Sequence, residues 1–146
     1  MSNLQAALGV AQTHRLESFA ARRRANFDRL HAALQGVEEH VVLPRALPEA
    51  EPNWFGYPLT LREGGAAARR SLQLHLLGNR VDSRLLLAGN MTRQPGFEGL
   101  DHRADEDLSV SDRITESALW VGCHPGLRAP MIDWIAECVT KWLQMR

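Results

Sequence analysis

One short segment after residue 88 gathers four polar side chains of different chemistry. Asn90 and Gln94 carry amides, Thr92 a hydroxyl and Arg93 a guanidinium, and Arg84 adds a second cation just upstream. Such groups hydrogen-bond sugar hydroxyls, a ketone or a diphosphate, and the planar fork of arginine binds two phosphate oxygens at once. The sequence therefore predicts a substrate-binding loop formed by Arg84, Asn90, Thr92, Arg93 and Gln94. The alternative interpretation is a polar loop that is held together by its own hydrogen bonds.

Signatures of catalysis and of metal binding are otherwise missing from the sequence. It contains no Gly-x-Gly-x-x-Gly, no P-loop and no Gly-x-Ser-x-Gly, and none of the six histidines pairs with another at metal-ligand spacing. A structural role is favoured for Cys123 and for His124, which precedes a Pro-Gly turn. The acidic residues near the end of the loop are expected to be solvated: Asp101, Asp105, Glu106 and Asp107. We therefore predict no catalytic residue, no cofactor-binding residue and no metal site.

The predicted loop must be positioned by the strand before it and by the helix after it. Hydrophobic periodicity, prolines and glycines predict the elements. In chain order these are a long helix to Gly36 with a break near Thr13–Arg15, a short strand at Val41–Leu43, a strand at Trp54–Leu61, a helix at Ala66–Leu77, a strand at Val81–Leu87, the loop Ala88–Asp107, a helix from Ser109 or Ser111 to Leu119, a short strand at Trp120–Gly122 and a last helix beginning near Pro130.

Two of these elements carry more specific expectations. In the strand at 54–61, alternation places Phe55, Tyr57, Leu59 and Leu61 on one face. Pro58 cannot donate to a ladder, so this strand is expected at a sheet edge or with a bulge. The last helix is expected to present one apolar stripe: Met131, Trp134, Ile135, Cys138, Trp142 and Met145.

Together the elements predict an α+β fold, a small two-layer unit with a few-stranded sheet and helices on one face. The length suits a single domain, residues 1–146. Residues 37–146 are expected to form a small lobe, and residues 1–36 a long, kinked helix. This helix has too little sheet beneath it, so we expect it to pack against another domain or a second copy of the chain.

Composition argues against several classes of partner. Basic and acidic residues both number 17, and this balance gives no reason to expect nucleic acid or an anionic membrane. No apolar run approaches the roughly 20 residues of a membrane span, and no leader sequence is visible. Two cysteines suggest neither a disulfide framework nor a metal knuckle. A cytoplasmic location is therefore expected.

Five stretches, in order and spacing, resemble one known family. They are Trp54-Phe55-Gly56-Tyr57-Pro58-Leu59, Arg84-Leu85-Leu86-Leu87-Ala88-Gly89-Asn90, Thr92-Arg93-Gln94-Pro95, Asp112-Arg113-Ile114 and Pro125-Gly126-Leu127. With them the chain is similar to the C-terminal small domain of the DegT–StrS sugar-nucleotide aminotransferases and dehydratases, which have the type I fold of pyridoxal phosphate enzymes.

The sequence of the loop indicates one branch of this family. Aminotransferases of the family usually carry a histidine-containing loop where this chain has Gly-Asn-Met-Thr-Arg-Gln-Pro. The loop sequence of this chain instead resembles that of the branch that includes CDP-4-keto-6-deoxyglucose 3-dehydrase. The resemblance implies a 3-dehydratase that uses pyridoxal or pyridoxamine phosphate to remove the C3 hydroxyl of a nucleotide-linked 4-keto-6-deoxyhexose, for the dideoxysugars of lipopolysaccharide. An aminotransferase of the same family is the alternative within it.

The resemblance also implies what the chain lacks. The family's cofactor phosphate loop, its pyridine-nitrogen carboxylate and its catalytic lysine or histidine match no residue here, and Lys141 matches no Schiff-base position. We expect the chain to hold no cofactor and to be inactive alone, its partners being the large domain or a second copy. Met1 resembles an internal methionine of the family, so a truncated chain is expected. A non-catalytic interaction module is the alternative from another functional class.

Overall fold

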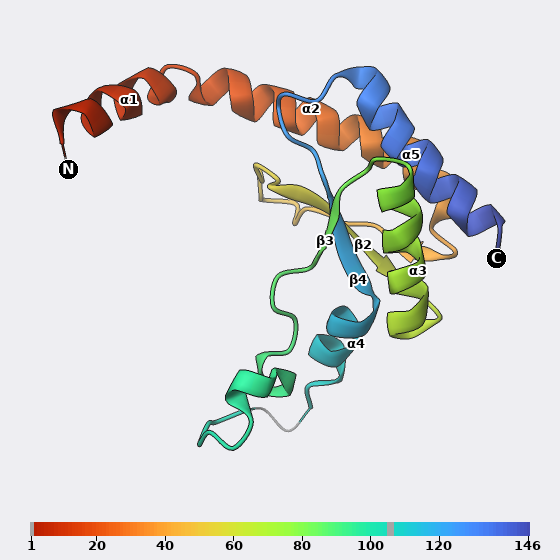
Figure 1. Cartoon of the computed structure of the whole chain (residues 1–146). Coiled ribbons are helices and arrows are strands. Elements are labelled where there is room, and N and C mark those ends of the chain that lie inside the picture. Colours follow the sequence, from red (N-terminus) through yellow and green to blue (C-terminus); the bar gives the residue numbers. More distant parts are fainter. Residues whose placement is uncertain (1, 105–106) are drawn as a thin grey trace.

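The computed structural model describes residues 2–104 and 107–146 (Figure 1). Within these residues the elements are α1 (Asn3–Thr13), α2 (Leu16–Leu34), η1 (Gln35–Val37), β1 (Val41–Val42), β2 (Gly56–Leu61), α3 (Gly65–Gly78), β3 (Ser83–Leu85), η2 (Met91–Arg93), η3 (Pro95–Phe97), α4 (Ser109–Ser117), β4 (Ala118–Gly122) and α5 (Ala129–Gln144), where η marks a short 3₁₀ helix. None of the described helices is both long and apolar enough to cross a membrane.

The four strands form one antiparallel sheet in the order β1-β2-β4-β3. The expectation that Pro58 marks an edge strand or a bulge is wrong, because β2 lies between β1 and β4. Pro58 is tolerated because β1 pairs only with Thr60 and Leu61, so that beside Pro58 the strand has no neighbour on that side. On the other side Pro58 lies opposite Trp120.

The hydrophobic core lies between one face of the sheet and the helices, as expected for a two-layer α+β fold. Tyr57, Leu59 and Leu61 alternate inward from β2, as period-2 spacing requires. They join buried side chains of α2, α3 and α5 in one cluster, which includes Leu30, Leu34, Leu72, Leu76, Ile132 and Val139. Helices α2 and α5 are also joined at the surface by a two-bond ion pair from Arg29 to Asp133, at 2.6 and 2.7 Å.

Two expectations about side-chain faces need correction. Phe55 does not share the buried face of β2, because β2 begins at Gly56 and the Phe55 side chain is 72% exposed. The expected apolar stripe of α5 is also rotated. Met131, Trp134 and Met145 are exposed, and the side chains that reach the core are Ile132, Ile135, Ala136, Cys138, Val139, Trp142 and Leu143.

Helix α1 and the start of α2 form an arm that extends away from the rest of the molecule, whereas the end of α2 packs against α5 (Figure 1). Ser2 caps α1 through a reciprocal capping box with Gln5. The expected break is confirmed, since α1 ends at Thr13 and α2 begins at Leu16. Residues 3–13 include no charged side chain, yet none of them is buried. Within the described part of the chain, α1 therefore has an apolar surface without a packing partner.

Candidate functional site

The loop that follows β3 is fastened to α4 through Gly89 and Thr115. Gly89 has a φ of +61°, a conformation that favours glycine. A side chain at this position would also collide with the Thr115 hydroxyl and approach its Cα to 3.1 Å. The Thr115 hydroxyl accepts a hydrogen bond from the backbone N–H of Asn90 at 2.6 Å and donates to the Ser111 carbonyl. The close approach of loop and helix therefore depends on the absence of a side chain at residue 89.

Asn90 is the anchor of the loop rather than an exposed polar group. Its side chain is buried, with 4% of the residue exposed. Its amide nitrogen donates to Asp112 Oδ1 at 2.6 Å. Its amide oxygen accepts from both the backbone N–H and the hydroxyl of Thr92, at 3.0 and 2.7 Å. Because these bonds engage both ends of the amide, Asn90 shapes the η2 turn that carries the next residues.

Arg93 is the exposed cation of this loop. Its Nε donates to Asp112 Oδ1 at 3.2 Å and its Nη2 to Asp112 Oδ2 at 3.0 Å, the side-on geometry of a two-bond arginine–carboxylate pair. The hydrogen bonds from Arg93 and Asn90 stabilise the ionised carboxylate and lower the pKa of Asp112. The same hydrogen bonding raises the pKa of Arg93, which therefore stays charged.

Gln94 and Arg84 are placed differently from the other three predicted residues. Gln94 closes the turn by donating from Nε2 to the Ala88 carbonyl at 2.8 Å. Arg84 lies in β3 opposite Trp120 and pairs with Asp82 at 3.5 Å. The strand β3 lies against β4 in the body of the molecule, whereas residues 91–97 follow at the other end of an extended segment (Figure 1). The structure thus brings Asn90, Thr92, Arg93 and Gln94 together, and Arg84 stands apart on the sheet.

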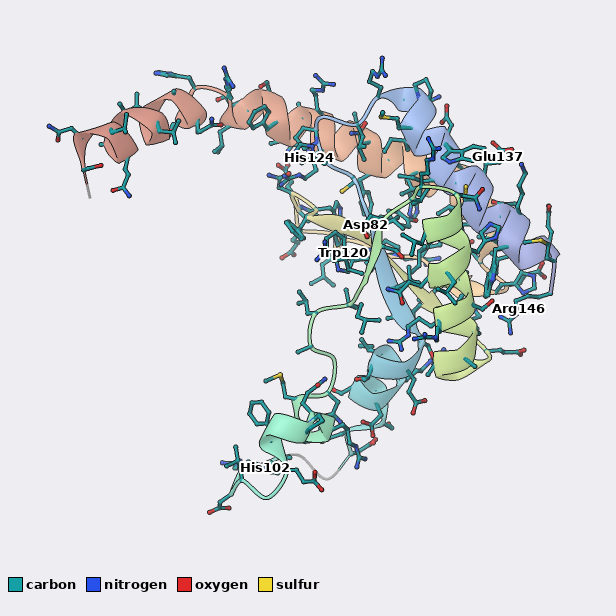
Figure 2. All side chains as sticks on the ribbon, in the orientation of Figure 1. Asp82, His102, Trp120, His124, Glu137 and Arg146 are labelled. Atoms are coloured by element: carbon teal, nitrogen blue, oxygen red, sulfur yellow. The ribbon has the colours of Figure 1, made fainter. Side chains whose placement is uncertain are left out.

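Two aromatic side chains lie near Arg84 on the sheet, where Arg84 is opposite the half-buried Trp120. The rings of Phe55 and Trp120 lie in contact, with centroids 5.0 Å apart. The Trp120 indole donates to the Leu85 carbonyl at 3.1 Å, which fixes the ring across β3. Figure 2 shows Asp82 and Trp120 near the centre of the molecule and His102 far along the loop. An aromatic pair beside a cation is a surface that can receive a flat or anionic group.

A groove of mainly apolar character lies elsewhere. It has a volume of about 820 Å³ and runs between the end of α3 and the start of α5, where Val81, Leu127, Met131 and Trp134 line it. His124 also borders it, but the ring nitrogen Nδ1 of His124 accepts from the Gly126 N–H and so serves the turn. None of the five predicted site residues lines this groove. Their prediction as a substrate site therefore rests on the loop itself.

The structure offers no site for a metal among the residues that it describes, where no group of three or more histidine, cysteine or acidic side chains converges. Asp105 and Glu106 of the acidic stretch lie outside the described residues. Asp107 accepts a hydrogen bond from the Ser109 N–H at 2.9 Å, just before α4. Cys123 is fully buried, and burial raises the pKa of its thiol, which makes it a structural cysteine.

Comparison with known proteins shows the family of the chain. Residues 1–140 match the DegT/DnrJ/EryC1/StrS aminotransferase family. The chain belongs to this family. It is 38% identical over 137 residues to the lipopolysaccharide biosynthesis protein RfbH of Salmonella typhimurium, covering 94% of this chain and 31% of that protein. It is 35% identical over 142 residues to the dTDP-4-dehydro-2,6-dideoxy-D-glucose 3-dehydratase of Saccharopolyspora spinosa, covering 97% of this chain and 30% of the relative.

Solved structures of a sugar-nucleotide dehydratase and of a sugar aminotransferase share the fold. A GDP-4-keto-6-deoxymannose-3-dehydratase superposes with a TM-score of 0.79 at 19% identity over 91% of this chain and 34% of the other. The putative sugar aminotransferase Spr1654 of Streptococcus pneumoniae gives a TM-score of 0.85 at 17% identity over 99% of this chain and 36% of the other. The chain thus spans about a third of the length of the family members that it matches.

Pyridoxal phosphate, to which this family is adapted, does not fit the lysine that the chain carries. Lys141 is its single lysine, and the ammonium pairs with Glu137 at 2.7 Å on the outer surface of α5. The hydrogen bond to Glu137 raises the pKa of Lys141, whereas an amine that forms an imine needs a lowered pKa. Lys141 is therefore engaged in a surface ion pair, which does not suit imine formation.

Two residues of the site were missed by sequence reasoning, Asp112 and Thr115. They bind the loop from α4, at sequence separations of 22 and 25 residues from Asn90. The stretch Asp112-Arg113-Ile114 resembles the family's sequence, and it was the signal that could have pointed to Asp112.

Proposed function

We propose that this chain is the C-terminal substrate-binding lobe of a pyridoxal or pyridoxamine phosphate-dependent sugar-nucleotide 3-dehydratase. Its substrate would be a nucleotide-linked 4-keto-6-deoxyhexose on the route to lipopolysaccharide dideoxysugars. One relative at 35% identity is a 3-dehydratase, and another at 38% is a lipopolysaccharide biosynthesis protein. The observation that carries the proposal is the loop at 89–94, which α4 holds in one conformation with the Arg93 cation outward.

In this proposal the five predicted residues divide the work of holding the substrate. Arg93 contributes charge and directed N–H groups to the diphosphate, and Arg84 adds a second cation from the sheet. Thr92 and Gln94 offer oxygen atoms to sugar hydroxyls. Asn90 keeps the turn in shape, because its own amide is engaged inside the loop. In this proposal, proton transfer and cofactor chemistry take place in the large domain. No residue of this chain is assigned a part in them.

The domain organisation follows from the same proposal. Residues 37–146 form the lobe together with the end of α2, whose Phe27, Leu30 and Leu34 belong to its core. The earlier part of the helix within residues 1–36 contacts the large domain or a second copy. The uncharged, exposed surface of α1 supports this assignment, since an exposed apolar surface marks an interaction site.

The proposed lack of activity is tested by mixing the pure chain with pyridoxal phosphate and recording the absorbance of a bound aldimine. We expect no stoichiometric signal, with free lysine at equal concentration as the reference for non-specific imine formation. A one-to-one signal would overturn the claim that the chain cannot hold the cofactor.

The proposed substrate role is tested by joining the chain to a separately produced large domain from the dehydratase relative. The reconstituted pair is expected to release water from the nucleotide-linked ketohexose, and Arg93→Gln is expected to weaken this activity through KM. Transamination in place of dehydration would favour the aminotransferase alternative.

A further inference from the structure

Three N–H groups converge on the carboxylate of Asp112. Asn90 Nδ2 and Arg93 Nε reach Oδ1 at 2.6 and 3.2 Å, and Arg93 Nη2 reaches Oδ2 at 3.0 Å. The side chain of Asp112 is 31% exposed, whereas that of Arg93 is 67% exposed. The aspartate is therefore the sheltered partner in α4, and the arginine is the partner that faces outward.

The side-on pair leaves one edge of the guanidinium available. An arginine side chain carries five N–H donors, on Nε, Nη1 and Nη2. Among the described residues, the hydrogen bonds from the Arg93 side chain run from Nε and Nη2 and end on Asp112. Because the guanidinium is planar, these two bonds also fix the direction in which the Nη1 donors point.

Asp112 is itself held in place from the other side. Its second contact, Asn90, is buried and is tied to Thr115 through the backbone. The carboxylate, the loop anchor and α4 thus form one connected network, and Arg93 is its outermost member. An aspartate that only neutralised an exposed arginine would not require this buried support.

We propose that Asp112 is the positioning residue of the substrate loop, holding the Arg93 guanidinium so that its Nη1 edge meets an oxyanion of the substrate's diphosphate. The assignment of the diphosphate rests on the proposed function. The carboxylate also brings a negative charge close to the ligand. Positioning outweighs this repulsion only if the ordered guanidinium binds the diphosphate better than a free one, and this balance can be measured.

The experiment uses the whole chain, labelled with ¹⁵N, and has two readouts. The first is the Nε–Hε signal of Arg93, which is sharp and slow to exchange when the guanidinium is fixed. The second is the dissociation constant for inorganic pyrophosphate and for a nucleoside diphosphate, taken from chemical-shift titration. Variants are Asp112→Asn, Asp112→Glu and Arg93→Gln, alone and as the double variant Asp112→Asn/Arg93→Gln.

A matched control comes from the ion pair between α2 and α5. Arg29 and Asp133 have the same two-bond geometry at 2.6 and 2.7 Å but lie outside the loop. Asp133→Asn therefore removes one exposed carboxylate charge and one arginine pair without touching the substrate loop. Circular dichroism on each variant verifies that the chain is folded.

We expect Asp112→Asn to release the Arg93 signal and to weaken pyrophosphate binding about tenfold, the equivalent of about 1.4 kcal/mol. Asp112→Glu should restore part of the affinity, and Asp133→Asn should change neither readout. The loss should vanish in the Arg93→Gln background, because a residue that acts through Arg93 has no effect without it. A general structural defect would persist in that background.

Three other results have distinct meanings. A freely rotating Arg93 in the unaltered chain overturns the positioning role. Equal or tighter pyrophosphate binding by Asp112→Asn overturns it as well, because charge repulsion would then outweigh orientation. A fixed Arg93 in a chain that binds neither pyrophosphate nor a nucleoside diphosphate supports positioning by Asp112 and instead refutes the proposed function of the loop.

Discussion

Replacing Gly89 by alanine should detach the loop from α4. Residue 89 has a φ of +61°, and the left-handed conformation costs an L-residue about 1–2 kcal/mol. The new methyl group would also collide with the Thr115 side chain. Relief of this collision moves the loop and breaks the 2.6 Å hydrogen bond from the Asn90 N–H, which contributes about 1 kcal/mol. The free energy of opening the loop should therefore fall by about 2–3 kcal/mol.

Hydrogen–deuterium exchange at the Asn90 amide measures this opening directly. A decrease of about 2–3 kcal/mol corresponds to exchange that is about 30- to 140-fold faster, since about 1.4 kcal/mol is a factor of ten. Gly96→Ala is the matched control, because Gly96 lies in the same loop with open space around it. If Gly89→Ala and Gly96→Ala exchange at the same rate at Asn90, the docking of the loop on Thr115 has been wrongly described.

Three further predictions concern other parts of the chain. Leu8→Glu places a charge on the exposed surface of α1, and sedimentation should show less self-association than in the unaltered chain; an unaltered chain that is already monomeric would speak against a self-pairing α1. Tyr57→Phe removes the 2.9 Å hydrogen bond to His31, and urea denaturation should show a loss of about 1 kcal/mol; no loss would mean that this bond has no net effect. The lowered pKa of Asp112 means that its contribution to stability is present above about pH 3.9 and is lost as the pH falls through the lower folded-state value. A carbon-detected titration of the Asp112 carboxyl should show its pKa rising toward the ordinary value in Arg93→Gln. An unchanged pKa would contradict the ion pair between Asp112 and Arg93.

Elements with strong local signals could be predicted from the sequence. The break between α1 and α2 follows from a change of phase in the apolar spacing at Thr13–Arg15, and it is present in the structure. Pairing between strands was harder to predict. Pro58 suggested an edge strand, but β1 is so short that it pairs beside Thr60 and Leu61 and leaves Pro58 without a neighbour on that side. The length of a partner strand is a property of tertiary structure, and local sequence does not carry it.

The candidate site shows the same division between local and distant information. Asn90, Thr92, Arg93 and Gln94 were identified because their polar groups are adjacent in the sequence. The bond from Asn90 to Asp112 could not be foreseen, because Asp112 comes from α4, 22 residues away. Residue types can therefore indicate a loop that could bind a ligand. Only the fold shows which of its groups are already engaged and which still face outward.

The position of the helix break has a practical consequence. The first core side chain in the chain is Phe27, so the first helix and the break at residues 14–15 lie outside the cooperative unit. A protease that cuts at Arg15 would release a short peptide and leave the remaining lobe with all its buried contacts. The surface of α1 can thus be altered without disturbing the buried core, and a different first helix could be grafted in its place.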